Sequence, residues 1–215
     1  KTFIFDMDGL IIKKKKLLVK YWLEAAHDYG YELKREHIIG IRSLSAKYAI
    51  PKLQKEAGQD FDYYKVRNKR MQMMNEHIEI YGLEEKPGLG ELLDYLKQNH
   101  YLTAVATATD PERTKKYLGS LHRLSYFDEI VCASMVQNGK PAPDIYLEAA
   151  RRLNVLPSEC MALEDSPNGI LSAYRAGMYP VMVPDLSKPD TDTEKLLYAC
   201  ADDLSQVIHI IEDFN

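Results

Sequence analysis

Helical and strand-like segments alternate regularly through the second half of the chain. Helical patterns over 89–98, 111–119, 143–153 and 168–176 each lead to an apolar β-type run, at 102–107, 129–132, 160–163 and 180–183. Parallel strands need such crossover connections, because a tight turn can join only antiparallel neighbours. The alternation therefore predicts an α/β fold, with a Rossmann-like parallel sheet that helices cover on both faces.

One further strand stands apart from this series, at residues 2–6. A helical pattern follows over 17–29 and ends at Gly30, and residues 34–82 are mostly helical in pattern up to the turn-forming Pro87 and Gly88. We therefore expect an α/β core over residues 1–13 and 84–215, with an inserted helical cap domain over 14–83.

Composition excludes several classes of protein. The 215 residues include 28 Lys and Arg and 32 Asp and Glu, a net charge of −4 that gives no reason to expect a nucleic-acid partner. We expect no membrane partner, because the sequence lacks a long apolar run and an evident signal peptide. The three cysteines form no C-x-x-C pair, which favours free thiols in the cytoplasm over a zinc or disulfide site. Nothing in the sequence requires more than a monomer.

Residues that suit phosphate chemistry, most of them polar, follow four of the expected strands. They are Asp6, Asp8 and Gly9 after the first, Thr107, Ala108 and Thr109 at the second, Lys140 after the third, and Glu164 and Asp165 at the fourth. Ligands of parallel sheets bind beyond the carboxyl ends of the strands, so we expect these side chains at one rim. Such a set suffices for Mg²⁺-assisted phosphoryl transfer through an aspartate nucleophile.

Each of these residues also has a purely structural interpretation. Thr107 could be an ordinary β-branched strand residue and Lys140 a solvated turn lysine. Glu164 and Asp165 could form a helix cap. Their joint occurrence, in this order at four strand ends, favours a functional site.

Four motifs carry a resemblance to a known family. They are DMDG at 6–9, VATAT at 105–109, GKPAPD at 139–144 and LEDSPNG at 163–169. With them the chain resembles the haloacid dehalogenase superfamily, in the branch with a helical cap inserted after the first strand. It is most similar to the β-phosphoglucomutase-like phosphatases.

The resemblance implies roles for individual residues. Asp6 would be the nucleophile and Asp8 the general acid and base, with Thr107 and Lys140 contacting the transferring phosphoryl group. Asp6, the main-chain carbonyl of Asp8 and Asp165 would hold Mg²⁺, with Glu164 as a further ligand or a partner of the ligands. Gly9, Ala108 and Thr109 are expected to bind substrate, and from the cap Arg42 is the best candidate to grip it.

The expected reaction is the hydrolysis of a small phosphorylated metabolite, such as a sugar phosphate, through an aspartyl-phosphate. Asp8 argues against dehalogenation, because the dehalogenases of the superfamily lack this second carboxylate. The alternative of a hexose-phosphate mutase is weakened, because the chain has no His after the nucleophile loop and has Ile39 where mutases have a Lys. A non-catalytic module that binds a phosphorylated ligand is the third hypothesis.

The run Lys13 to Lys16 departs from the family pattern, which commonly has acidic or hydroxyl residues there. Four adjacent ammonium groups repel one another, so we expect a solvated hinge. One alternative is that Lys14 helps to attract anionic substrates, and another is that these four letters are not the natural residues. In the non-catalytic hypothesis, an ammonium group of the run occupies the metal or phosphate site.

Overall fold

The protein is built around a parallel β-sheet in the computed structural model, which describes residues 1–185 and 188–214. Its strands are β1 (Thr2–Phe5), β2 (Leu102–Thr107), β3 (Glu129–Cys132), β4 (Cys160–Glu164), β5 (Tyr179–Met182) and β6 (Ala199–Cys200). The order is β3-β2-β1-β4-β5-β6, and all neighbours pair in parallel. The predicted α/β sheet is confirmed. The short strand β6 was not predicted, because two residues carry no periodicity.

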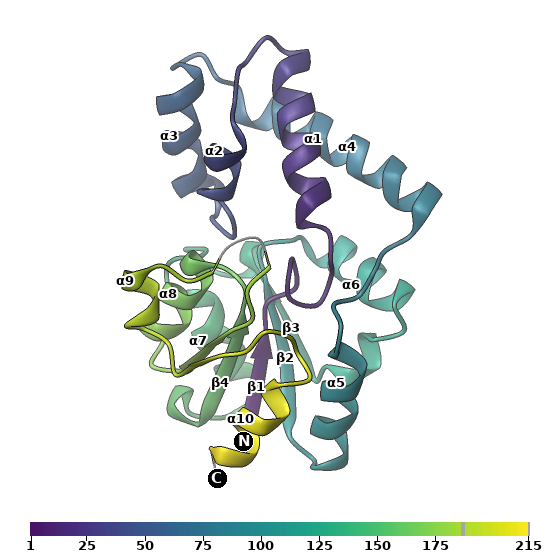
Figure 1. Cartoon of the computed structure of the whole chain (residues 1–215), viewed down its shortest axis with the longest axis vertical. Helices are drawn as coiled ribbons and strands as arrows, with labels where there is room; N and C mark the ends of the chain where they lie inside the picture. The colour runs from purple at the N-terminus through teal and green to yellow at the C-terminus, as the bar shows by residue number, and fades with distance from the viewer. Residues whose placement is uncertain (186–187, 215) are drawn as a thin grey trace.

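Helices fill the segments where helical patterns were expected. Between β1 and β2 lie α1 (Lys15–Asp28), α2 (Arg35–Ile39), α3 (Ala46–Ala57), α4 (Tyr63–Tyr81) and α5 (Leu89–Gln98). Later in the chain come α6 (Pro111–Ser120), α7 (Asp144–Arg152), α8 (Pro167–Arg175), α9 (Thr191–Glu194) and α10 (Val207–Asp213). Helices α9 and α10, which follow the strand β5, were not predicted. Helices α1 to α4 stand together above the end of the sheet, purple to blue in Figure 1. None of the described helices combines the length and apolar character that crossing a membrane requires.

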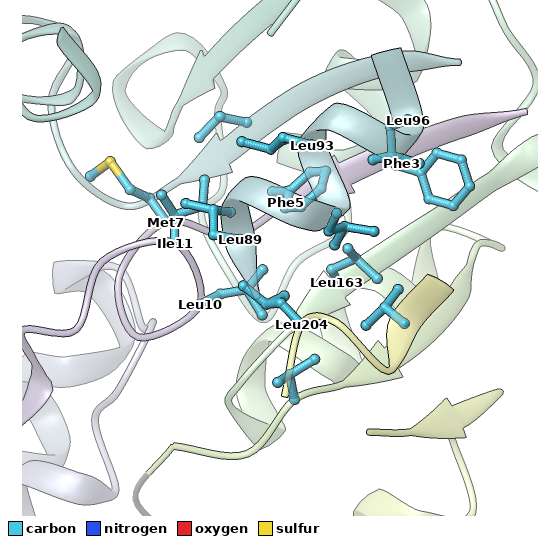
Figure 2. Close-up of a cluster of buried hydrophobic side chains, with 14 of the residues drawn as sticks. Phe3, Phe5, Met7, Leu10, Ile11, Leu89, Leu93, Leu96, Leu163 and Leu204 are labelled. Atoms are coloured by element: carbon cyan, nitrogen blue, oxygen red, sulfur yellow. The ribbon is translucent and has the colours of Figure 1, made fainter. Parts of the chain in front are cut away.

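The sheet is buried on both faces, as predicted. Successive side chains of a strand point to opposite faces, so Phe3 and Phe5 of β1 pack in one apolar cluster and Ile4 packs in another. Leu89 and Leu93 of α5 cover the phenylalanines, as Figure 2 shows. Helix α7 contributes all its buried side chains to the second cluster, and α8 contributes Ala173. Strands β1 and β4, the two middle strands of the sheet, are buried along their whole length.

Helices α1 to α4 have an apolar core of their own. It includes Val19 and Trp22 of α1, Leu53 of α3 and Val66 of α4, each at most 3% exposed. The two chain segments that join this layer to the sheet run side by side, because the backbone N–H of Lys13 donates to the carbonyl oxygen of Glu84 at 2.8 Å. The helical layer is therefore joined to the core at this pair of adjacent linkers. It also contacts the core directly, because the backbone N–H of Ser45 donates to Lys140 O at 3.3 Å and Asn168 Nδ2 donates to Arg42 O at 2.9 Å.

Candidate active site

The carboxyl ends of the three central strands bring the predicted catalytic residues together. Phe5 of β1 is in register with Val105 of β2 and Leu163 of β4. The next residue, Asp6, continues this alignment, and its backbone N–H donates to Leu163 O at 3.0 Å. Register alone therefore places Asp6 beside the ends of β2 and β4.

Lys140 connects these strand ends through its ammonium group. Its Nζ lies 2.7 Å from Asp6 Oδ1 and 2.6 Å from Glu164 Oε1, and it donates to the carbonyl oxygen of Ala106 at 2.9 Å. Burial would by itself lower the pKa of Lys140, but the carboxylates of Asp6 and Glu164 raise it above its usual value. Lys140 is only 2% exposed, so the alternative of a solvated turn lysine is wrong.

Both oxygens of Glu164 are already occupied by protein donors. Oε1 accepts from Lys140 and from the hydroxyl of Tyr146 at 2.8 Å, and Oε2 accepts from the backbone N–H of Asp165 at 3.1 Å. Sequence reasoning missed Tyr146, because its position on α7 looks like an ordinary core position. The helix-cap interpretation of Glu164 and Asp165 is wrong, because the hydroxyl of Ser166 caps α8.

Three buried carboxylates lie close enough to share a metal ion. Asp6, Glu164 and Asp165 each offer an oxygen within 4.8 Å of the others. Asp6 Oδ2 and Asp165 Oδ1 are buried and accept no hydrogen bond from the part of the chain that the structure describes. Hard carboxylate oxygens are the ligands that Mg²⁺ prefers, so these residues fit such an ion. Burial raises the pKa of Asp6, and Lys140 opposes that rise.

The side chain of Asp8 points to a different set of partners. Its Oδ2 accepts a hydrogen bond from the hydroxyl of Thr109 at 2.7 Å, and its Oδ1 lies 2.7 Å from Lys14 Nζ. Burial would by itself raise the pKa of Asp8, but Lys14 and the Thr109 hydroxyl hold it below its usual value. Thr107 is fully buried, and its hydroxyl accepts from the backbone N–H of Thr109 at 3.1 Å.

Two lysines of the 13–16 run are buried, which contradicts the expected solvated hinge. Lys13 and Lys16 are exposed, but Lys14 and Lys15 are only 5% and 3% exposed. Lys15 Nζ donates to Asp165 Oδ2, while Lys14 Nζ also lies 4.3 Å from the ring centre of Tyr117. Repulsion between the lysines is overcome because each buried ammonium faces its own carboxylate.

A pocket of about 120 Å³ lies between the sheet and the helical layer. Predicted residues line it from both sides: Asp6, Asp8, Ala108 and Thr109 from the core, and Arg42 from the helical layer. Arg42 is 5% exposed, so it is a buried side chain and not a surface arginine. Gly9 lies beside the pocket at a φ of +102°, against Lys15 and Asp165.

Arginines that sequence reasoning missed add to this lining. Arg67 and Arg70 of α4 and Arg113 of α6 face the same pocket. The Nε of Arg70 is buried without a hydrogen-bond partner among the described residues. Burial, and the neighbouring positive charges of Arg67 and Arg113, lower the pKa of Arg70 to about 10. The four-then-three spacing of Tyr63, Arg67 and Arg70 could have indicated a shared helix face.

Comparisons with known proteins identify the family of the chain. A family model described as haloacid dehalogenase-like hydrolase matches residues 3–183. The chain is 32% identical over 175 residues to a phosphorylated carbohydrates phosphatase of Thermotoga maritima, with 81% of each chain covered. It is 33% identical over 227 residues to a Drosophila melanogaster protein named "probable pseudouridine-5'-phosphatase", covering 98% of this chain and 90% of that one.

A solved β-phosphoglucomutase from Clostridium difficile has the same fold. Its TM-score to this chain is 0.80 at 23% identity, over 99% of this chain and 95% of that one. The family resemblance stated from the motifs is thereby confirmed. The chain belongs to the haloacid dehalogenase-like hydrolase family.

Proposed function

We propose that this protein is a Mg²⁺-dependent phosphatase that hydrolyses a small phosphorylated metabolite, such as a sugar phosphate, through an aspartyl-phosphate. The observation that carries the proposal is the position of Asp6. Its Oδ1 is held by Lys140 and its Oδ2 has no hydrogen-bond partner among the described residues, at the base of a pocket lined by cations. A carboxylate so placed can approach a phosphate anion.

In the first step, a carboxylate oxygen of Asp6 attacks phosphorus and the bond from phosphorus to the ester oxygen breaks. Lys140 offsets the repulsion between carboxylate and phosphate, because its ammonium lies 2.7 Å from Asp6 Oδ1. The Thr107 hydroxyl and the backbone around Gly9 and Ala108 bind the phosphoryl oxygens.

Asp8 handles the protons in both steps. The neutral carboxyl form of Asp8 gives a proton to the departing alkoxide, and the resulting carboxylate then removes a proton from the water that cleaves the aspartyl-phosphate. Because the contact with Lys14 favours the ionised form, Lys14 must leave Asp8 when substrate binds. Thr109 holds the Asp8 carboxyl through its hydroxyl at 2.7 Å, and both residues line the pocket. Arg42, together with Arg67 and Arg70, grips the rest of the substrate.

Asp6, Asp165 and the main-chain carbonyl of Asp8 would hold the Mg²⁺ ion, which supplies positive charge to stabilise the transferring phosphoryl group. Glu164 supports this cluster by orienting Lys140, because its own oxygens are occupied. As part of this proposal, residues 14–83 form a cap domain that sets the choice of substrate. Their separate apolar core supports their assignment as a domain.

The substrate class is supported by the charge of the pocket and by the relatives. Arg42, Arg67 and Arg70 line it from the helical layer, and an anionic ligand would neutralise them. The relative from Thermotoga maritima is named for phosphorylated carbohydrates. A sugar phosphate offers both the phosphate that the cluster needs and hydroxyls that the loops can bind.

A second candidate function is a non-catalytic module that binds a phosphorylated ligand. It is favoured by the contacts of Lys14 with Asp8 and of Lys15 with Asp165, which engage the proposed acid and base and a proposed metal ligand. Such a module would bind phosphate compounds without turnover.

The test is phosphate release from a panel of phosphorylated metabolites, with Mg²⁺ and with a chelator, for the wild type and for Asp6→Asn. We expect Mg²⁺-dependent release by the wild type and a loss of at least about a thousandfold in the variant, because its amide is not a nucleophile. Ligand binding without release would favour the non-catalytic module. Isomer exchange without release would indicate a mutase.

A further inference from the structure

Lys15 lies inside the carboxylate cluster, although its neighbours in the run do not. It is the first residue of α1, and its side chain passes over Gly9 to reach Asp165. Both side chains of this ion pair are buried, Lys15 at 2% and Asp165 at 0% exposure. An ammonium is stable in such a place only when carboxylates compensate its lost hydration.

Lys15 is one of two lysines that compensate the negative charge of the carboxylate cluster. The carboxylates of Asp6, Glu164 and Asp165 are compensated by Lys140 on one side and by Lys15 on the other. Lys15 uses Asp165 Oδ2, whereas Asp165 Oδ1 stays without a hydrogen-bond partner among the described residues. A metal ion that used Asp165 Oδ1 would therefore share this carboxylate with the ammonium of Lys15.

We propose that Lys15 is a tethered cation that competes with divalent metal for Asp165, so that the metal affinity of this chain is limited by the release of its own ammonium group. The inference rests on the proposed function, because it concerns the metal ligands named there. A divalent ion that enters the cluster meets the charge of Lys15 at contact distance from one of its ligands. Like charges so close in a buried site are mutually destabilising, and the ion and the ammonium cannot both be bound fully.

The chain offers matched controls for this competition. Lys16 is the next residue and is exposed, so Lys16→Met removes the same charge without touching the cluster. Lys15→Arg keeps the charge at the same position. Lys15→Met removes it with an apolar side chain that is similar in length and flexibility.

The experiment is isothermal titration calorimetry with MgCl₂, without substrate, on the wild type and these three variants. Lys15→Met should bind Mg²⁺ at least about tenfold more tightly than the wild type, because the competing charge is gone. Lys16→Met should match the wild type within about twofold, since an exposed charge is screened by salt. The Mg²⁺ affinity of Lys15→Arg should be closer to that of the wild type than the affinity of Lys15→Met is, because arginine keeps the charge.

Equal or weaker Mg²⁺ binding by a folded Lys15→Met variant overturns the proposal. If that variant does not fold, acetylation of Lys15 in the wild type replaces it, followed by peptide mass spectrometry. Labelling of Lys15 should rise with added Mg²⁺ as its ammonium is released, while labelling of Lys16 stays constant. Labelling of Lys15 that does not change with Mg²⁺ also overturns the proposal.

The two hypotheses fail in different ways. If Lys15→Met binds Mg²⁺ more tightly but no substrate releases phosphate, the proposed competition stands and the proposed phosphatase function is refuted. If the wild type releases phosphate in a Mg²⁺-dependent way and Lys15→Met binds Mg²⁺ as the wild type does, the phosphatase function stands and the competition is refuted.

Discussion

At the scale of single residues, the site depends on charges that are held in pairs, with Asp8 the one partly exposed member. Lys140 with Asp6, Lys14 with Asp8 and Lys15 with Asp165 each combine an ammonium with a carboxylate. Removing one member of a buried pair leaves the other uncompensated, which costs more than the pair contributes. Substitutions here therefore need controls that separate folding from function.

Gly9 is expected to tolerate no side chain. It has a φ of +102°, and an added Cβ would overlap Lys15 and Asp165, whereas Gly30 has a φ of +81° with open space around it. Gly30→Ala should cost about 1 kcal/mol from backbone strain alone, and Gly9→Ala about 1–3 kcal/mol more from overlap. Urea unfolding measures both. Equal losses would mean that Lys15 moves aside freely.

Glu148 should give the protein a measurable dependence on acidic pH. Hydrogen bonds from Arg151 and Arg152 lower its pKa from 4.5 to about 2. Because the folded pKa is the lower one, the stabilisation is complete above pH 4.5 and is lost as the pH falls towards 2. Glu148→Gln should therefore cost about 0.5 kcal/mol at pH 7, with a smaller difference at pH 3. A difference that grows on acidification contradicts this sign.

At the scale of elements, helix α4 presents one face to the pocket. Tyr63, Arg67, Arg70 and Met74 follow one another at spacings of four, three and four residues, and all line the pocket. The side chain of Asp62 caps the start of this helix by accepting from the backbone N–H of Lys65. The helix is thus fixed at its start and carries two guanidinium groups over the site.

Arg70→Met should weaken substrate binding more than turnover. Its guanidinium lines the same pocket as Asp6 and Asp8, and its Nε lacks a hydrogen-bond partner among the described residues, so a substrate anion is its expected partner. We expect KM to rise about tenfold with kcat changed little, as for the loss of one charge-assisted hydrogen bond. Lys69→Met is the control, because Lys69 pairs with Asp28 in the helical layer. Equal effects of both substitutions would refute a specific contact.

At the scale of the whole molecule, two separate cores meet at the site. The sheet and the helical layer bury their own apolar clusters, and adjacent linkers join them at Lys13 and Glu84. The pocket between them is lined by both, so closing the layer over the core would exclude water from the site.

Hydrogen exchange should resolve these two cores. Amides of α1, α3 and α4 should exchange with a lower free energy of opening than those of β1, β2 and β4, since the layer can open without unfolding the sheet. Phosphate with Mg²⁺ should slow exchange most at the linkers around 13–14 and 82–86. If all these amides exchange with one common free energy of opening, the sheet and the helical layer unfold as a single cooperative unit, which would contradict this prediction.

The sequence by itself determined the sheet, the helical insert and the main catalytic side chains. Apolar periodicity is a local property, so the strand 102–107 and the helix 89–98 were predicted with the bounds that the structure has. Asp6, Thr107, Lys140 and Asp165 could be placed at one rim because parallel strands end at the same edge.

Only the tertiary structure decided which charges are buried. Lys15 meets Asp165, 150 residues away, and Tyr146 meets Glu164 from the interior of α7. No local pattern distinguishes Lys14 and Lys15 from the exposed Lys13 and Lys16, because burial of an ammonium depends on distant carboxylates that compensate its lost hydration. The sequence therefore predicts the chemistry of this site, and the fold sets which cations occupy it.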